Sequence, residues 1–268
     1  MIIESILGMV VGLIMGLTGA GGGILAVPAL VLVLGTDIKV AAPVTLVAVS
    51  LAGILGAIDG LRRGWVRYKA AALMSSMGAV TAPLGVMIAR HLPSAWLMVM
   101  FACIMAFVSF RSYQKALPRS STIVTENPIK PCMVSPETGR FVWSPRVAAT
   151  IGAIGATSGL FTGMLGVGGG FIIVPALQKF SNVGIHSVVA TSLMVIALIS
   201  GATVGNALLS TQFQWPANMT AFVVFALVGM LVGRVASPRL SPRLLQLGFA
   251  TVCALVAITV LVKTAAGI

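Results

Sequence analysis

Two clusters of glycine are the residues in this chain best suited to bind a ligand. Each cluster holds four glycines: Gly19, Gly21, Gly22 and Gly23 in the first, and Gly166, Gly168, Gly169 and Gly170 in the second. Glycine lacks a Cβ, so its backbone N–H groups can face a ligand closely. A helix that begins just after each cluster, at Ile24 and at Phe171, would add the positive end of its dipole. The two clusters therefore predict binding sites for an anion.

Three hydroxyl side chains could add to such a site. Thr45 lies in the apolar run after the first cluster, and Thr191 and Ser192 lie at nearly equivalent places after the second. Their hydroxyl groups could bind the oxygens of an anion, although a hydroxyl bonded to its own helix backbone is the open alternative. A side chain at Gly22 or Gly169 should block access to the backbone donors. Valine at either position is expected to abolish binding while leaving the protein folded.

Motifs of soluble enzymes and of metal sites are missing. Neither glycine cluster has the third glycine of a dinucleotide-binding loop, and no GK[ST] follows. No nucleophile elbow or zinc-protease motif occurs. The three cysteines form no CxxC or Cys/His cluster. We therefore expect no enzyme activity, no cofactor and no metal ion.

The composition indicates that these clusters lie within a membrane protein. Of the 268 residues, 58% are hydrophobic and only 8% are charged, and the mean hydropathy is +1.08. A soluble domain carries roughly a quarter charged residues. Continuous apolar stretches favour helices over a barrel, which needs alternating polar positions. The sequence thus predicts an all-α polytopic membrane protein, with uncharged runs at 5–36, 40–58, 70–89, 95–110, 147–178, 187–233 and 244–262.

The net charge of +12 also has a topological explanation. Lysine and arginine lie between the apolar runs, where the positive-inside rule places them in cytoplasmic loops. A nucleic-acid partner is therefore not expected, whereas membrane lipids are.

The chain contains an internal duplication. Shifting it by 147 residues aligns 8–30 with 155–177, and 12 of these 23 positions are identical, including a Val-Pro-Ala-Leu run in register. A polar, basic segment separates the two copies. We expect a first transmembrane repeat at 1–110, a cytoplasmic linker at 111–146 and a second transmembrane repeat at 147–268.

The distribution of charge indicates that the repeats are inverted relative to each other. The basic loop follows the second run of the first repeat, at 59–69, but it moves to 234–243 in the second repeat. Counting basic loops as cytoplasmic places 59–69, 111–146 and 234–243 inside. Loops 90–94 and 210–216 and both termini then lie outside. Inverted repeats are a common architecture of transporters.

The two glycine clusters lie inside apolar runs of unusual length. Runs 5–36 and 147–178 each hold 32 residues, about 48 Å as one straight helix, which exceeds the bilayer core. Split at the glycines, each arm measures about 20 Å and is too short to cross alone. Each repeat should therefore consist of a glycine-interrupted helical hairpin and three spanning helices. Interrupted helices at matching positions of two repeats point to a transporter's binding site.

The alternative to a ligand site is that the glycines only allow tight helix packing. We expect this role for three glycines in each half, which keep the small-xxx-small spacing of packed helices: Gly8, Gly12 and Gly16, and Gly155, Gly159 and Gly163. The triple glycines remain candidates for the site. No Asp or Glu lies within the runs, so a free cation has no strong ligand there.

The paired motifs GLTGAGGGILAVPAL at 16–30 and GMLGVGGGFIIVPAL at 163–177 resemble the TauE/SafE, or sulfite exporter, family of membrane transporters. The resemblance covers essentially the whole chain. It implies a multi-pass carrier of the bacterial inner membrane for sulfite, organosulfonates or related small anions, with the glycine motifs near the pathway. Our interpretation is a secondary transporter or facilitator of a sulfur-containing or carboxylate anion. An anion channel and a membrane-bound accessory protein without transport activity are the alternatives. The sequence is compatible with an oligomer.

Overall fold

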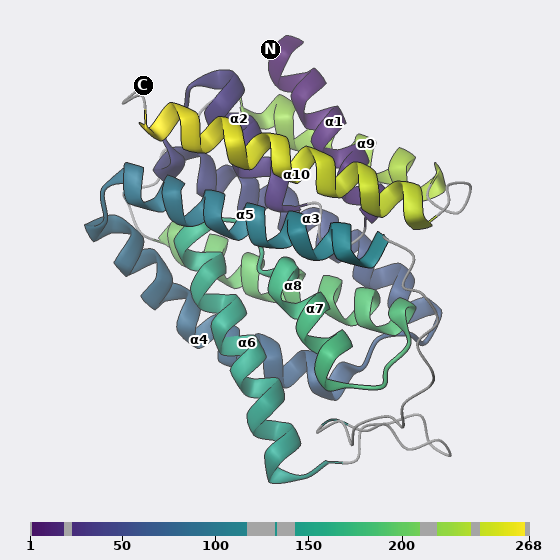
Figure 1. Cartoon of the computed structure of the whole chain (residues 1–268). Coiled ribbons are helices and arrows are strands. Elements are labelled where there is room, and N and C mark those ends of the chain that lie inside the picture. The colour runs from purple at the N-terminus through teal and green to yellow at the C-terminus, as the bar shows by residue number, and fades with distance from the viewer. Residues whose placement is uncertain are drawn as a thin grey trace.

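The computed structural model describes residues 2–18, 23–116, 132, 143–209, 219–236 and 242–265, and these parts are helical almost throughout (Figure 1). Seven of the described helices are long and apolar enough to cross a membrane. The expected all-α polytopic fold is therefore confirmed. The helices are α1 (Ile2–Thr18), α2 (Ala26–Leu34), α3 (Ile38–Arg62), α4 (Tyr68–His91), α5 (Ser94–Ala116), α6 (Pro145–Leu165), α7 (Gly170–Phe180), α8 (Ile185–Leu209), α9 (Met219–Ala236) and α10 (Pro242–Ala265).

The helix ends follow local capping chemistry. Asp37 precedes α3, and its carboxylate accepts a hydrogen bond from the backbone N–H of Lys39 at 2.8 Å. Ser144 caps α6 in the same way through Val147, and Pro145 occupies the first turn, where its missing N–H costs nothing. These caps fix where two central helices begin.

The two glycine-interrupted runs form helix pairs with arms of unequal length. In the second run, α6 has 21 residues and counts among the candidate spans, whereas α7 has only 11. The expectation that neither arm could cross was therefore wrong for α6. The helix begins at Pro145, ahead of Arg146, so the uncharged run underestimated its length. The second arms also begin at slightly different residues than expected: α7 at Gly170, and α2 at Ala26 after a 3₁₀ turn over 23–25.

The principal helix contacts join the two halves, and they repeat when the halves are exchanged. Helix α1 packs against α9, and its counterpart α6 packs against α4. Helix α3 packs on its own counterpart α8, and α5 packs on α10 (Figure 1). The core of the described structure is therefore an interface between the two halves of the chain.

Glycines bring the helix backbones close together in this interface. A Cβ on Gly12 would lie 2.7 Å from the carbonyl carbon of Ala226 in α9, and one on Gly159 would lie 2.6 Å from that of Gly78 in α4. Gly8 and Gly16, and their counterparts Gly155 and Gly163, are equally crowded by facing backbone. The prediction that these six glycines serve packing is confirmed, because any side chain would push the helices apart.

Helices α3 and α8 run antiparallel across the middle of the protein. Ser50 donates to the carbonyl of Ala197 at 3.3 Å, and ten residues further along α3 a Cβ on Gly60 would contact Ala190, which lies earlier in α8. Helices α5 and α10 also begin at opposite ends of their contact (Figure 1).

Little of the predicted linker at 111–146 is part of the described structure. Helix α5 extends through its first residues to Ala116, and α6 begins at Pro145. Between them, the N–H of Cys132 donates to the carbonyl of Phe180 at 3.0 Å, which attaches the linker to the end of α7. Burial raises the pKa of the Cys132 thiol, so the thiol stays protonated at neutral pH.

Candidate functional site

The second glycine cluster forms a buried tip between α6 and α7. Gly166, Gly168 and Gly169 all adopt left-handed backbone, with φ of +73°, +76° and +66°. Gly166 ends α6 by donating its N–H to the carbonyl of Thr162 at 2.9 Å, and α7 begins at Gly170. No side chain caps the N-terminus of α7. The positive end of its helix dipole therefore lies at the tip without a side-chain cap.

Two hydroxyl groups donate hydrogen bonds to backbone carbonyls of this tip. Thr45, from α3, donates to the carbonyl of Gly166 at 2.8 Å and to that of Ala42 in its own helix at 2.9 Å. Ser158, from α6, donates to the carbonyl of Gly169 at 3.2 Å. Both side chains are completely buried. Thr45 thus lies at the tip, where its hydroxyl proton binds protein carbonyls.

The sequence analysis missed Ser200, a hydroxyl residue beside the tip. Ser200 is completely buried in α8, and its Oγ has no hydrogen-bond partner within the described structure. A Cβ on Gly168 would lie 3.3 Å from this oxygen. An unpaired buried hydroxyl costs about 1–3 kcal/mol, so Ser200 calls for a partner that the described residues do not supply.

The first glycine cluster is only partly described. Gly19, Gly21 and Gly22 lie outside the described residues, whereas Gly23 is buried against the second tip. A Cβ on Gly23 would lie 3.2 Å from Val49 in α3 and 3.3 Å from the carbonyl oxygen of Val167. The two hairpins therefore meet at Gly23 and Val167.

Thr191 and Ser192 lie elsewhere. Thr191 accepts a hydrogen bond from the backbone N–H of Arg67 at 3.0 Å, and Ser192 donates to the carbonyl of Val189 in its own helix at 2.9 Å. Both lie at least eight residues before Ser200 in α8, about 12 Å along the helix. The structure therefore does not bring these two hydroxyls to the tip, although both are buried.

A cavity of about 320 Å³, which we call the α7/α10 cavity, opens onto the start of α7. It includes Gly170 and Phe171 and reaches the first turns of α8 and α10 at Ile185 and Leu245. The cavity contains one charged side chain, Arg111 of α5, and no carboxylate within the described structure. Its other polar side chains are neutral: Thr18, Ser112, Gln178 and Gln246. Helix N-termini together with a guanidinium group create a positive potential in this cavity.

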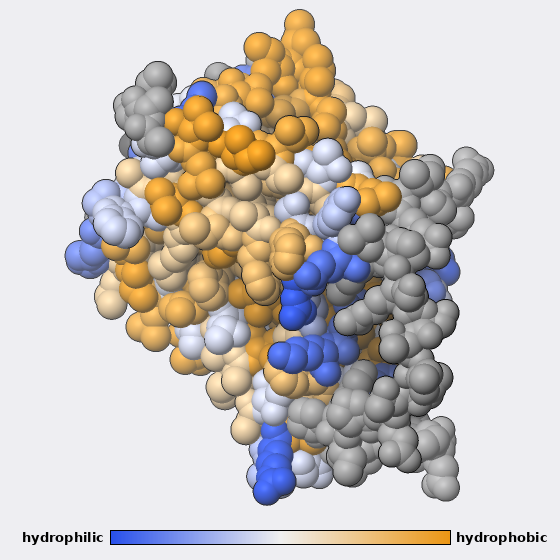
Figure 2. Space-filling model, in the orientation of Figure 1, coloured by the Kyte–Doolittle hydropathy of each residue, from blue (hydrophilic) through white to orange (hydrophobic). Residues whose placement is uncertain are grey.

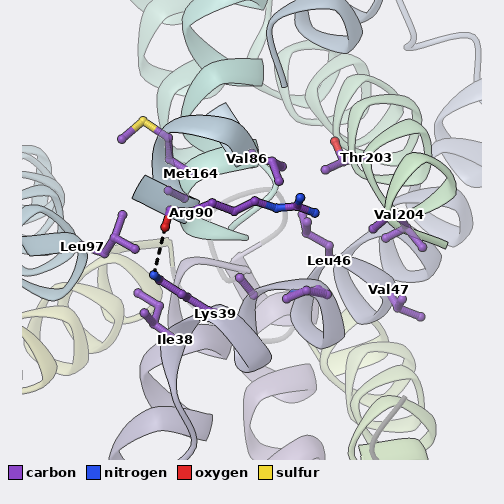
Figure 3. A pocket seen from close by; sticks show the side chains of 15 residues that line it. Ile38, Lys39, Leu46, Val47, Val86, Arg90, Leu97, Met164, Thr203 and Val204 are labelled. Atoms are coloured by element: carbon purple, nitrogen blue, oxygen red, sulfur yellow. Dashed lines mark hydrogen bonds between the residues drawn. The ribbon is translucent and has the colours of Figure 1, made fainter. Parts of the chain in front are cut away.

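A second cavity of about 300 Å³, the α4/α8 cavity, lies on the other side of the tip. Arg90 extends through it toward Thr203 of α8, and Lys39 donates to the carbonyl of Arg90 at 3.3 Å (Figure 3). The remaining wall is mostly apolar and includes Leu46 and Met164. This cavity is also basic.

Helix α8 passes both cavities and the glycine tip along its length. Val189 lines the α7/α10 cavity, Ser200 lies beside Gly168, and Thr203 lines the α4/α8 cavity. Val189 and Thr203 are 14 residues apart, about 21 Å along the helix. The glycine tip therefore separates two basic cavities that lie toward opposite ends of one spanning helix.

The described residues provide no group of three His, Cys, Asp or Glu side chains that could hold a metal ion. What the arrangement can do chemically is offer backbone N–H groups, a hydroxyl and guanidinium groups to a small anion.

Known proteins resemble this chain over nearly its full length. The family model described as sulfite exporter TauE/SafE matches residues 5–260. A probable membrane transporter protein of Xylella fastidiosa strain Temecula1 is 28% identical over 235 residues, covering 87% of this chain and 84% of that protein. The probable membrane transporter protein YjnA of Bacillus subtilis is 26% identical over 259 residues, covering 92% and 94%.

Proposed function

This chain belongs to the sulfite exporter TauE/SafE family of membrane transporters, and we propose that it carries a small anion across the bacterial inner membrane. The expected substrates are sulfite, an organosulfonate, or a related sulfur-containing or carboxylate anion. The relatives are named as transporters and not as enzymes. Secondary transport or facilitated passage fits a chain without any nucleotide-binding motif.

The observation that carries this proposal is the charge of the α7/α10 cavity. The uncapped N-terminus of α7 and Arg111 both line this cavity, and no carboxylate lines it within the described structure. One helix N-terminus is equivalent to about half a positive charge. A small anion would therefore find compensation from the dipole and from one cation, while a metal cation would be repelled.

The binding position we propose is the glycine tip itself. An anion beside Gly168 would be within reach of Ser200, whose buried hydroxyl has no other partner in the described structure. Backbone N–H groups at Gly169 and Gly170 would supply further donors. The first cluster, with Gly19, Gly21, Gly22 and Gly23, completes the site in this proposal, because Gly23 contacts the second tip.

An inverted relation of the two repeats is part of the same proposal. The antiparallel packing of α3 on α8, and of α5 on α10, supports it, as does the exchange of basic loops along the sequence. Inverted repeats allow one binding position to be reached alternately from two sides. The two basic cavities on either side of the tip provide such routes.

Transport by purified protein in liposomes tests the proposal. We expect saturable counterflow of radiolabelled sulfite, with competition by the anions that share the site. Arg111→Gln should raise KM about 10-fold or more, because the guanidinium attracts the anion into the α7/α10 cavity on its way to the tip. Lys263→Gln is the matched control, because Lys263 is exposed in the last turn of α10 and lines neither cavity.

The outcomes separate the alternatives. Flux that does not saturate and shows no counterflow would indicate an anion channel. No flux of any tested anion by folded protein would favour an accessory protein and reject transport. Saturable sulfite transport with an unchanged KM in Arg111→Gln would show that the anion does not reach its site through the α7/α10 cavity.

A further inference from the structure

A large open groove runs along the outside of α5, α6 and α7, next to the α7/α10 cavity. Its volume is about 500 Å³ and its wall is almost entirely apolar. Helix α5 contributes Ile104 and Phe107, α6 contributes Phe161, and α7 contributes Ile172 and Ala176. An apolar groove on a membrane-spanning surface faces hydrocarbon chains, so its wall is suited to an acyl chain.

Two basic side chains stand at one end of this groove. Arg111 lies near the C-terminal end of α5, and Lys179 lies in the last turn of α7. Their charged groups lie over the rings of Phe107 and Phe180, at 5.6 and 5.4 Å from the ring centres. No carboxylate lines the groove within the described parts of the chain. Hydrophilic side chains gather where α5 ends, and hydrophobic surface extends away from them (Figure 2).

We propose that this groove binds one anionic phospholipid, with its phosphate between Arg111 and Lys179 and an acyl chain along Ile104, Phe161 and Ile172. Two cations at the end of an apolar groove are complementary to a phosphate at the end of a hydrocarbon chain. A zwitterionic lipid would fit the apolar wall equally well, but its positive headgroup would weaken the electrostatic attraction. Selectivity for negative headgroups therefore distinguishes this site from ordinary lipid contact.

The position of the groove links lipid binding to the anion site. Arg111, Phe171 and Pro175 line both the groove and the α7/α10 cavity. A phosphate bound to Arg111 would compete with a transported anion for that guanidinium group. This consequence rests on the proposed function, whereas lipid binding itself does not.

Lipid retention measures the site directly. The protein is reconstituted in nanodiscs of equal parts phosphatidylglycerol and phosphatidylcholine, purified in detergent, and analysed by native mass spectrometry. We expect the wild type to retain one phosphatidylglycerol with about thirtyfold preference, since each of the two basic residues contributes about 1 kcal/mol at an anionic surface. Lys179→Gln should reduce this preference to about fivefold, because Arg111 remains.

A second variant and a control distinguish loss of the lipid site from loss of folding. Ala176→Trp keeps both cations but fills the apolar part of the groove, so it should also displace the bound lipid. Lys263→Gln removes a cation at an exposed position of α10 and should retain lipid as the wild type does. Equal retention of the two lipids by wild-type protein would overturn the proposal. So would an unchanged preference in both groove variants. Because no transport is measured, these results do not depend on whether the protein carries an anion.

Discussion

Substitution of Gly169 by alanine tests the geometry of the glycine tip. The residue has a φ of +66°, and a Cβ there would overlap Ser158 Oγ and lie 2.7 Å from Thr162 Oγ1. Left-handed backbone costs a non-glycine residue about 1–2 kcal/mol, and overpacking costs about 1–3 kcal/mol. We expect Gly169→Ala to lower the free energy of unfolding by about 3 kcal/mol and the melting temperature by about 6–12 °C. Valine at Gly169 would meet the same side chains and backbone strain, so binding by Gly169→Val has to be measured on protein shown to be folded.

Thermal unfolding of detergent-purified protein provides the measurement, with sulfite affinity determined on the folded fraction. Gly248→Ala is the control, since Gly248 lies inside α10 with no atom near its added Cβ. In a Ser158→Ala background, Gly169→Ala should cost less, because the overlapping hydroxyl is gone. A stability of Gly169→Ala within about 0.5 kcal/mol of wild type would refute the tip geometry. If the stability losses of Gly169→Ala and Ser158→Ala simply add in the double variant, the contact between the added Cβ and Ser158 is refuted.

Three further predictions address packing, charge and topology. Gly12→Ala and Gly159→Ala should each lower the free energy of unfolding by about 1–3 kcal/mol, because each added Cβ meets a facing helix backbone. If only one of the two variants is destabilised, the two positions are not equivalent. Asp59→Asn should keep substantial transport and lower the free energy of unfolding by less than about 1 kcal/mol, because the ion pairs of Asp59 with its two arginine partners are partly exposed. Complete loss of transport at normal expression would assign Asp59 a role in the mechanism. Cysteines placed at Ser120 and Thr211 should react with an impermeant maleimide from opposite sides of the membrane, and labelling from one side only would contradict inverted repeats.

The packing of the repeats was predictable because it depends on residue size at fixed spacing. Gly12 and Gly159 occupy the same position of a duplicated pattern, and small residues every four positions indicate a helix face that meets another backbone. The structure places both against counterpart helices, α9 and α4. Which helix each would meet could not be predicted, because spacing defines a face but not its partner.

Helix ends were less predictable, because each apolar run was ended at the nearest charged residue. Arg111 and Arg146 both lie within helices, although the sequence analysis assigned them to the linker. Long basic side chains can remain in a helix near a membrane surface and extend their charged groups toward water. The Ser144–Pro145 pair carried the usual signal for a helix start, and it locates the beginning of α6 correctly.

The role of each hydroxyl could not be derived from the sequence, because it depends on which acceptor lies nearby in three dimensions. A hydroxyl has one proton to donate, and Thr45 donates it to protein carbonyls. Ser192 donates to its own helix, as Ser and Thr in apolar helices generally do. Ser200 has the same residue type and lies in the same helix, yet it lacks a described partner. Its hydroxyl beside Gly168 is therefore more informative than the hydroxyls at Thr45 and Ser192, because no described residue satisfies it and a bound anion could.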